Sequence, residues 1–269
     1  MRLYVGADVN TSPGSAAEKV LCGLAGVLAP TGVPLLAQYR QKLDIGGLSA
    51  LATNALAATL LEIQLKCCNF ELQHWAALCS LRSLEKAILV LQPKVQQQPI
   101  AQPPFTIQSM QLTNLHFLQF SSTRVELAAP LLAHGATLTA LETLYFVGCD
   151  LGTLPAAVLK LHQLSTLGMH RCQLTQLPSL APLTRLVSLQ LPSNPALVDL
   201  RPALAAQQQL QFLMLGGTTP LTEATLDALR GLASLLSVDI SKQSWSSSAA
   251  AALGYLVQLT HDKDCHLIT

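Results

Sequence analysis

The sequence predicts an α/β solenoid, in which a curved parallel β-sheet forms the concave face and helices and turns form the convex face. Two observations support this class. Residues 141–155 and 164–178 share the skeleton L-x-x-L-x-apolar-x-x-C-x-L-x-x-L-P at an interval of 23 residues, while their x positions differ. Related segments also begin at 115, 186, 210 and 235, so successive starts are 26, 23, 22, 24 and 25 residues apart. A fixed apolar skeleton with free intervening residues indicates repeated architecture, not a repeated active site.

The first half of each unit predicts a short strand, because L-x-L alternates and buries one face. We expect eight such parallel strands. Seven lie in segments that start at residues 60, 115, 141, 164, 186, 210 and 235, and the eighth would be a tentative copy carried by Leu84, Ala87 and Leu89. Degenerate copies are expected before residue 60. There, Leu3 with Val5, and Ala37 with Tyr39, would be the strand positions.

The second half of each unit must return the chain to the next strand. Residues 222–231 predict a helix, with a Thr cap, an acidic first turn and Gly after Arg. Residues 16–27 and 48–61 could be similar. At Pro155 and Pro178 a proline follows the last leucine, which favours a tighter turn or short helix.

These units resemble leucine-rich repeats, whose pattern L-x-x-L-x-L-x-x-N/C-x-L is carried, for example, by residues 186–194 (LVSLQLPSN). The resemblance covers residues 60–74 and 115–259. We therefore divide the chain into N-terminal degenerate repeats or a cap (1–59), a repeat array (60–259) with an inserted Pro- and Gln-rich loop at about 93–111, and a C-terminal cap (260–269).

The resemblance implies that the ninth side chain of each unit points inward and hydrogen-bonds turn backbone between coils. Asn does this well and Cys is a weak donor. Cys149 and Cys172 are therefore expected to be structural, with a metal or redox role as the alternative. The ninth positions are Cys68, Thr123, Cys149, Cys172, Asn194, Thr218 and Gln243.

Composition narrows the classes of function. A net charge of +1 and a pI near 7.6 give no electrostatic reason to expect nucleic acid as a partner. Seven irregularly spaced cysteines argue against a disulfide framework and favour a reducing intracellular compartment. Mean hydropathy is +0.40, but the most apolar stretches, 20–39 and 45–61, are interrupted by Pro, Gly and polar residues. We expect neither a secretory signal nor membrane insertion.

Motifs for chemistry are missing from the sequence: it contains no phosphate-binding glycine loop, H-E-x-x-H, G-x-S-x-G or C-x-x-C. Gly216-Gly217 is interpreted as a tight strand-to-turn junction. The cluster His261 to His266 could bind zinc, but its spacing is unusual, and a polar turn into a capping strand at 265–268 is favoured. No catalytic residue, metal or cofactor is predicted.

The outward side chains of the strands are the candidate site. Positions 3, 5, 7 and 8 of each unit should lie on the concave face, where exposed aromatic and apolar groups tend to mark interaction sites. The alternative is that Phe and Met only cover neighbouring coils. The candidate partner-binding residues are Glu62, Gln64, Lys66, Phe117, Gln119, Tyr145, His170, Arg171, Gln190, Phe212, Met214 and Asp239.

The expected function is a protein-binding scaffold that recognises another protein on the concave face and is not an enzyme. We expect a monomer in the cytoplasm, with the cytoskeleton or a ciliary axoneme as possible locations. The alternatives are a recognition or regulatory subunit of an enzyme complex, of the ubiquitin-ligase adaptor or phosphatase-regulator type, or a structural component of a cytoskeletal or ciliary assembly.

Overall fold

The computed structural model describes residues 3–8, 35–40, 60–67, 74–91, 111–197, 199–217, 223–241 and 266–268. The chain forms two compact units, Met1–Leu141 (unit 1) and Glu142–Thr269 (unit 2). The predicted insertion at 93–111 and the proposed helix at 16–27 lie almost wholly outside the described residues. The domain boundaries at 59/60 and 259/260 stay predictions.

Unit 1 is built on five parallel strands, each paired with the next along the chain. Its strands are β1 (Leu3–Asp8), β2 (Leu35–Arg40), β3 (Leu60–Cys67), β4 (Lys86–Leu91) and β5 (Phe117–Ser121). Its helices are α4 (His74–Cys79), α5 (Val125–Ala133) and the 3₁₀ turn η2 (Gly135–Thr137). The end of the proposed helix 48–61 is wrong, since Leu60 and Leu61 belong to β3.

Unit 2 repeats this arrangement with six parallel strands. They are β6 (Thr143–Val147), β7 (Thr166–His170), β8 (Ser188–Gln190), β9 (Phe212–Met214), β10 (Ser237–Asp239) and β11 (His266–Ile268). The helical segments are η3 (Ala156–Lys160), α6 (Arg201–Leu204) and α7 (Glu223–Arg230). The predicted helix at 222–231 and the short helix after Pro155 are confirmed.

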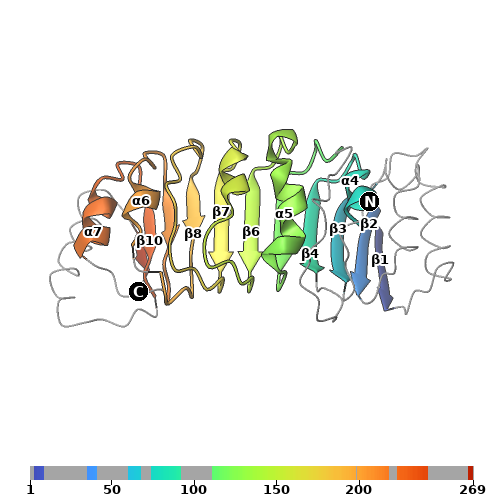
Figure 1. Cartoon of the computed structure of the whole chain (residues 1–269), viewed down its shortest axis with the longest axis horizontal. Helices are drawn as coiled ribbons and strands as arrows, with labels where there is room; N and C mark the ends of the chain where they lie inside the picture. The colour runs from blue at the N-terminus through green and yellow to red at the C-terminus, as the bar shows by residue number, and fades with distance from the viewer. Residues whose placement is uncertain are drawn as a thin grey trace. The chain divides into compact units, whose positions relative to one another are not determined.

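The described residues hold eleven strands: the eight of the predicted repeats, β1 and β2 at the predicted degenerate copies, and β11 at the predicted capping strand. In the register of β1 and β2, Val5 pairs with Ala37 and Ala7 pairs with Tyr39. The predicted strand positions Leu3 and Val5 are therefore each two residues too early to match Ala37 and Tyr39. In each unit the helices cover one face of the sheet (Figure 1). Among the described residues, no helix is long and apolar enough to cross a membrane.

Leucines at the fixed motif positions form the core. Leu144 and Leu167 occupy neighbouring strands in register, and both are fully buried. In unit 1, where the leucine pattern is less regular, Trp75 fills the interior. Its indole Nε1 donates to the Leu127 carbonyl at 2.8 Å, and its ring meets Phe120 edge to face at 6.4 Å between centroids.

The four described ninth-position side chains, Thr123, Cys149, Cys172 and Asn194, point inward as predicted, while Cys68, Thr218 and Gln243 lie outside the described residues. Buried Asn194 is the most connected: its Oδ1 accepts from the amides of Cys172 at 2.9 Å and Leu174 at 3.3 Å. Its Nδ2 lies 2.7 Å from the Met169 carbonyl and 2.8 Å from the Leu191 carbonyl. Asn194 therefore joins its own coil to the preceding one by satisfying backbone groups that water cannot reach.

Thr and Cys fill the same position with fewer bonds. Thr123 Oγ1 donates to the Leu89 carbonyl at 3.3 Å, and Cys172 Sγ lies 3.3 Å from the Phe146 carbonyl. Cys149 and Cys172 are buried free thiols, and burial raises the pKa of Cys172 to about 12. A thiol that stays protonated at physiological pH is a poor nucleophile, which supports the structural interpretation of Cys172, and burial supports it for Cys149.

In five successive repeats, the residue before the ninth position has a left-handed backbone conformation. The φ angles are 48° at Ser122, 63° at Gly148, 54° at Arg171, 60° at Ser193 and 69° at Gly217. The chain leaves each of these strands through this one residue and then turns the ninth side chain inward. Only glycine adopts this conformation without a steric cost from Cβ.

Candidate functional site

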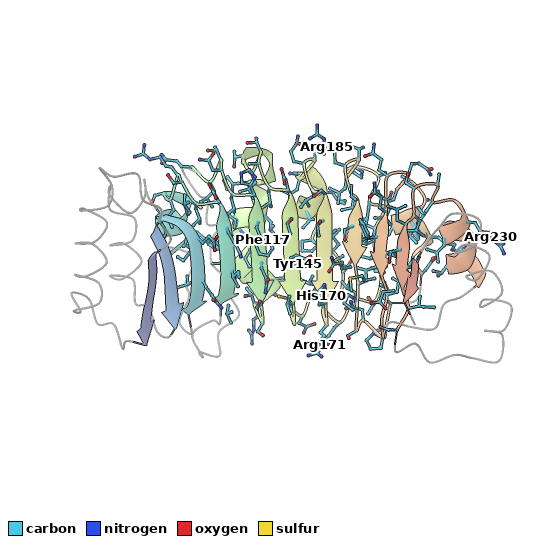
Figure 2. The ribbon with its side chains drawn as sticks, turned by 180° about the vertical axis from the view of Figure 1, so that it is seen from behind. Phe117, Tyr145, His170, Arg171, Arg185 and Arg230 are labelled. Carbon is cyan, nitrogen blue, oxygen red and sulfur yellow. The ribbon has the colours of Figure 1, made fainter. Side chains whose placement is uncertain are left out.

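The sheet face opposite the helices carries those predicted site residues that lie on strands and whose side chains are described, and we call it the open face of each unit. Figure 2 views the strands from this side. Side chains at the third, fifth and seventh motif positions alternate with the buried leucines, as in β5 and β6, where half-buried and buried residues alternate along the strand. The two units are described separately below.

On unit 1, the third-position row brings Glu62, Lys86 and Phe117 together in register across β3, β4 and β5. Lys86 Nζ lies 3.9 Å from Glu62 Oε2 and 5.4 Å from the centroid of the Phe117 ring. Lys86 was not among the predicted site residues, although the tentative copy that starts at Leu84 places it at position 3. Phe117 is therefore half-buried beneath a cation.

The fifth-position row of unit 1 aligns Gln64, Ile88 and Gln119. Gln64 is exposed, whereas Gln119 is half-buried and donates from Nε2 to Ser121 Oγ at 2.9 Å. Lys66 pairs with Val90 through the backbone of β3 and β4, and its side chain lies outside the described part of the structure. This row offers amides and one branched apolar residue.

On unit 2, Tyr145 lies across the neighbouring strand. Gly168 is its register partner, and a Cβ built on Gly168 would stand 2.2 Å from Cδ1 of the tyrosine ring. The absence of a side chain at Gly168 therefore makes the space that the ring occupies. Tyr145 also meets His170 edge to face, with 5.5 Å between ring centroids.

Hydrogen bonds continue this cluster onto β8. His170 Nε2 lies 3.2 Å from Gln190 Oε1, and Gln190 Nε2 donates to Ser188 Oγ at 3.3 Å. Burial lowers the pKa of His170, and the bond to Gln190 opposes that shift. Tyr145, His170 and Gln190 were predicted as separate contact residues, and the structure makes them one packed cluster.

Phe212 lies on β9 and is the most exposed open-face aromatic of the described residues, at 43% of its surface. Its register neighbours are Ser188 and Ser237. In the next row, half-buried Met214 aligns with Gln190 and Asp239. The Asp239 carboxylate accepts from the Ser241 amide at 2.8 Å.

Arg171 follows β7 directly and is exposed. Figure 2 shows Tyr145, His170 and Arg171 succeeding one another toward the end of the strands, with Arg171 at the margin of the sheet. His170 is on the open face and Cys172 is buried in the interior, as the sequence predicted.

Metal chemistry finds no support in the described ranges, where no three His, Cys, Asp or Glu side chains form a group that could hold an ion. Of the cluster 261–266, only His266 is described, and it begins β11. This strand pairs with β10, close to the capping strand predicted at 265–268.

Comparison with known proteins identifies the fold. No protein-family model matches the sequence, and no curated protein matches it. Among solved structures, an internalin (InlF) of Listeria monocytogenes is 21% identical with a TM-score of 0.55, over 89% of this chain and 68% of that one. The Toll–Spatzle complex of Drosophila contains a chain that is 17% identical with a TM-score of 0.53, over 99% of this chain and 36% of that one. The chain has the leucine-rich-repeat fold.

Proposed function

We propose that this chain is a protein-binding module and that the open face of unit 2 is its contact surface. The observation that carries the proposal is Phe212, a large aromatic side chain 43% exposed between Ser188 and Ser237. Burying the rest of such a ring against a partner would be favourable, and aromatic anchors dominate the energetics of protein interfaces.

The rigidity of this face supports the proposal. Tyr145, His170, Gln190 and Asp239 are already held by ring contacts or hydrogen bonds. Side chains ordered in advance lose little conformational entropy on association. One protein with this fold, Toll, is known in complex with Spatzle.

The test compares Phe212→Ser with Leu236→Ser in affinity capture from cell extract, with quantitative mass spectrometry. Leu236 is a matched control because it is equally exposed, at 43%, on the adjacent coil. It precedes β10 by one residue, so strand alternation directs it away from the open face.

We expect Phe212→Ser to lower the recovery of a specific partner at least tenfold, while Leu236→Ser retains it. Both variants should melt within a few degrees of wild type, because each residue is largely exposed. Equal recovery with both variants would contradict the proposal. The paired change of Tyr145 and Phe212 to Ser extends the test to β6.

We also propose a reducing, intracellular location for this module. The support is that Cys79, Cys149 and Cys172 are buried free thiols. Differential alkylation in intact cells, before and after denaturation, tests this: all three should be recovered as thiols. Recovery of any of them as a disulfide would contradict it.

A further inference from the structure

We propose that Arg171 is the anchor for a carboxylate of the partner, so that unit 2 recognises an acidic segment of a protein. This inference rests on the proposed function and specifies the chemistry of the partner. It is carried by the backbone at Arg171, by the charges that surround it and by its register relative to Phe212.

The backbone gives no reason for an arginine at this position. Arg171 has a φ of 54°. The equivalent residues of the four other repeats described above are Ser122, Gly148, Ser193 and Gly217. A left-handed backbone conformation favours glycine, and a long side chain does not make that conformation more stable. Strained residues of this kind concentrate at functional sites. Because exposed Gln173 also adopts a φ of 53°, the backbone permits a long side chain here, and the case for Arg171 depends on its charge and its surroundings.

The guanidinium has no anion inside the described protein. The ion pairs of the described ranges include Lys86 with Glu62 and Arg201 with Asp199, and in those ranges the Arg171 side chain takes part in no ion pair or hydrogen bond. On the open face of unit 2, the carboxylate of Asp239 accepts from the Ser241 amide and lies three strands away. The Arg171 guanidinium is thus exposed, and no carboxylate of the described residues neutralises its charge.

A protein carboxylate fits this donor better than a polyanion does. Arginine binds carboxylates through two parallel hydrogen bonds, and a single pair of this type is sufficient for recognition. Nucleic acid or an anionic membrane needs many cations on one surface. The chain has a net charge of +1, and the open-face cluster beside Arg171 is made of Tyr145, His170 and Gln190, with no second Lys or Arg.

The register also predicts the spacing of the ligand. Phe212 is level with Thr166, two strands from β7, and Arg171 is five residues farther along. At about 4.8 Å between strands and about 3.3 Å per residue, the two side chains originate about 19 Å apart. An extended segment covers that distance in about six residues. The expected ligand therefore has an acidic residue and an apolar residue about six positions apart.

The test is selection of random 12-residue peptides displayed on phage against the full chain, followed by fluorescence anisotropy of the enriched peptides. The informative variant is Arg171→Gly, which removes the charge and relaxes the left-handed backbone, so that lost binding is not lost folding. Gln173→Gly is the matched control. Gln173 is exposed, two residues away, with a φ of 53°.

We expect peptides with the acidic and apolar pair to bind wild type and Gln173→Gly alike, and Arg171→Gly at least tenfold more weakly. Peptides that need Phe212 but bind Arg171→Gly normally would overturn this inference and leave the proposed function standing. Peptides indifferent to both positions, or no selected peptide at all, would overturn both.

Discussion

At the scale of single residues, the ninth motif position shows how one location tolerates different chemistry. Asn194 satisfies two amides and bonds carbonyls on two coils, whereas Cys172 offers one weak thiol donor. Since the surrounding backbone groups are buried, the number of bonds lost on substitution should decide the cost.

We expect Asn194→Ala to lower the free energy of unfolding by about 2–4 kcal/mol, because two buried amides lose their acceptor. Cys172→Ala should cost only about 1 kcal/mol, mainly through the small cavity that it leaves. Urea denaturation of both variants checks this order. Similar losses of stability for the two variants would mean that the ninth-position side chains stabilise the fold by packing and not by hydrogen bonding.

A second prediction concerns left-handed backbone. Gly152 has a φ of 61°, and a Cβ at this position would meet no atom within 4 Å. Gly152→Ala should therefore cost about 1 kcal/mol through backbone strain alone. Gly231→Ala is the control, because its Cβ would make an ordinary contact of 3.4 Å with the Ala228 carbonyl and no left-handed φ is involved.

The control should change the free energy of unfolding by less than about 0.5 kcal/mol. Both values come from the same urea titration. A neutral Gly152→Ala would show that the turn relaxes out of the left-handed region when Cβ is present.

At the scale of strands, the packing of Tyr145 over Gly168 couples β6 to β7 on the open face. A methyl group at residue 168 would overlap the ring at 2.2 Å, so the ring must leave its place and its contact with His170. The severe overlap exists only while Tyr145 is present, because the other nearby atom, His170 Nε2, would stand 3.2 Å from the new methyl group. A double-mutant cycle therefore measures the interaction.

We expect Gly168→Ala to destabilise wild type by about 1–2 kcal/mol and to be close to neutral in a Tyr145→Ala background. Urea unfolding of the four proteins of the cycle gives the coupling energy. Additive effects of the two substitutions would contradict the described position of the ring.

The strand scale is also where sequence reasoning reaches its limit. The apolar skeleton predicts which residues are buried, as Leu144 and Leu167 show, because burial follows from the periodicity of one chain segment. It also predicts that Tyr145 and Phe212 face outward. It does not distinguish them, because the difference depends on the residue across the strand: Gly168 beside Tyr145, and serines beside Phe212.

Lys86 was missed for a related reason. Its unit is the irregular copy that starts at Leu84, so its outward residues were not counted among the site residues. Its contacts with Glu62 and Phe117 require the register of three strands, which spacing within one unit does not provide. The alignment of neighbouring units is thus the information that the sequence alone lacked.

At the scale of the whole molecule, two compact units divide near residue 141. In each, a strand pairs only with its sequence neighbours, so stability depends on successive interfaces. Leu167 is fully buried between Leu144 and Leu189. A charge placed at this position would be buried without a partner.

We expect Leu167→Asp to remove amide hydrogen-exchange protection across unit 2 first, with a smaller loss in unit 1. Thr166→Asp is the matched control, because Thr166 directly precedes Leu167 but is only half-buried and lies on the open face. It should leave protection nearly unchanged. Wild-type exchange in Leu167→Asp, or an equal loss in both units, would contradict the description of two units.

The recurring left-handed residue has a consequence for how such a chain can be rearranged. From Ser122 to Gly217 it stands at one fixed point of every coil. If two genes of this kind were recombined at that codon, the joined residues would have the same backbone conformation. Whole repeats could then be duplicated, deleted or exchanged without a conformational mismatch at the junction. Crossovers anywhere else would have to rebuild the junction.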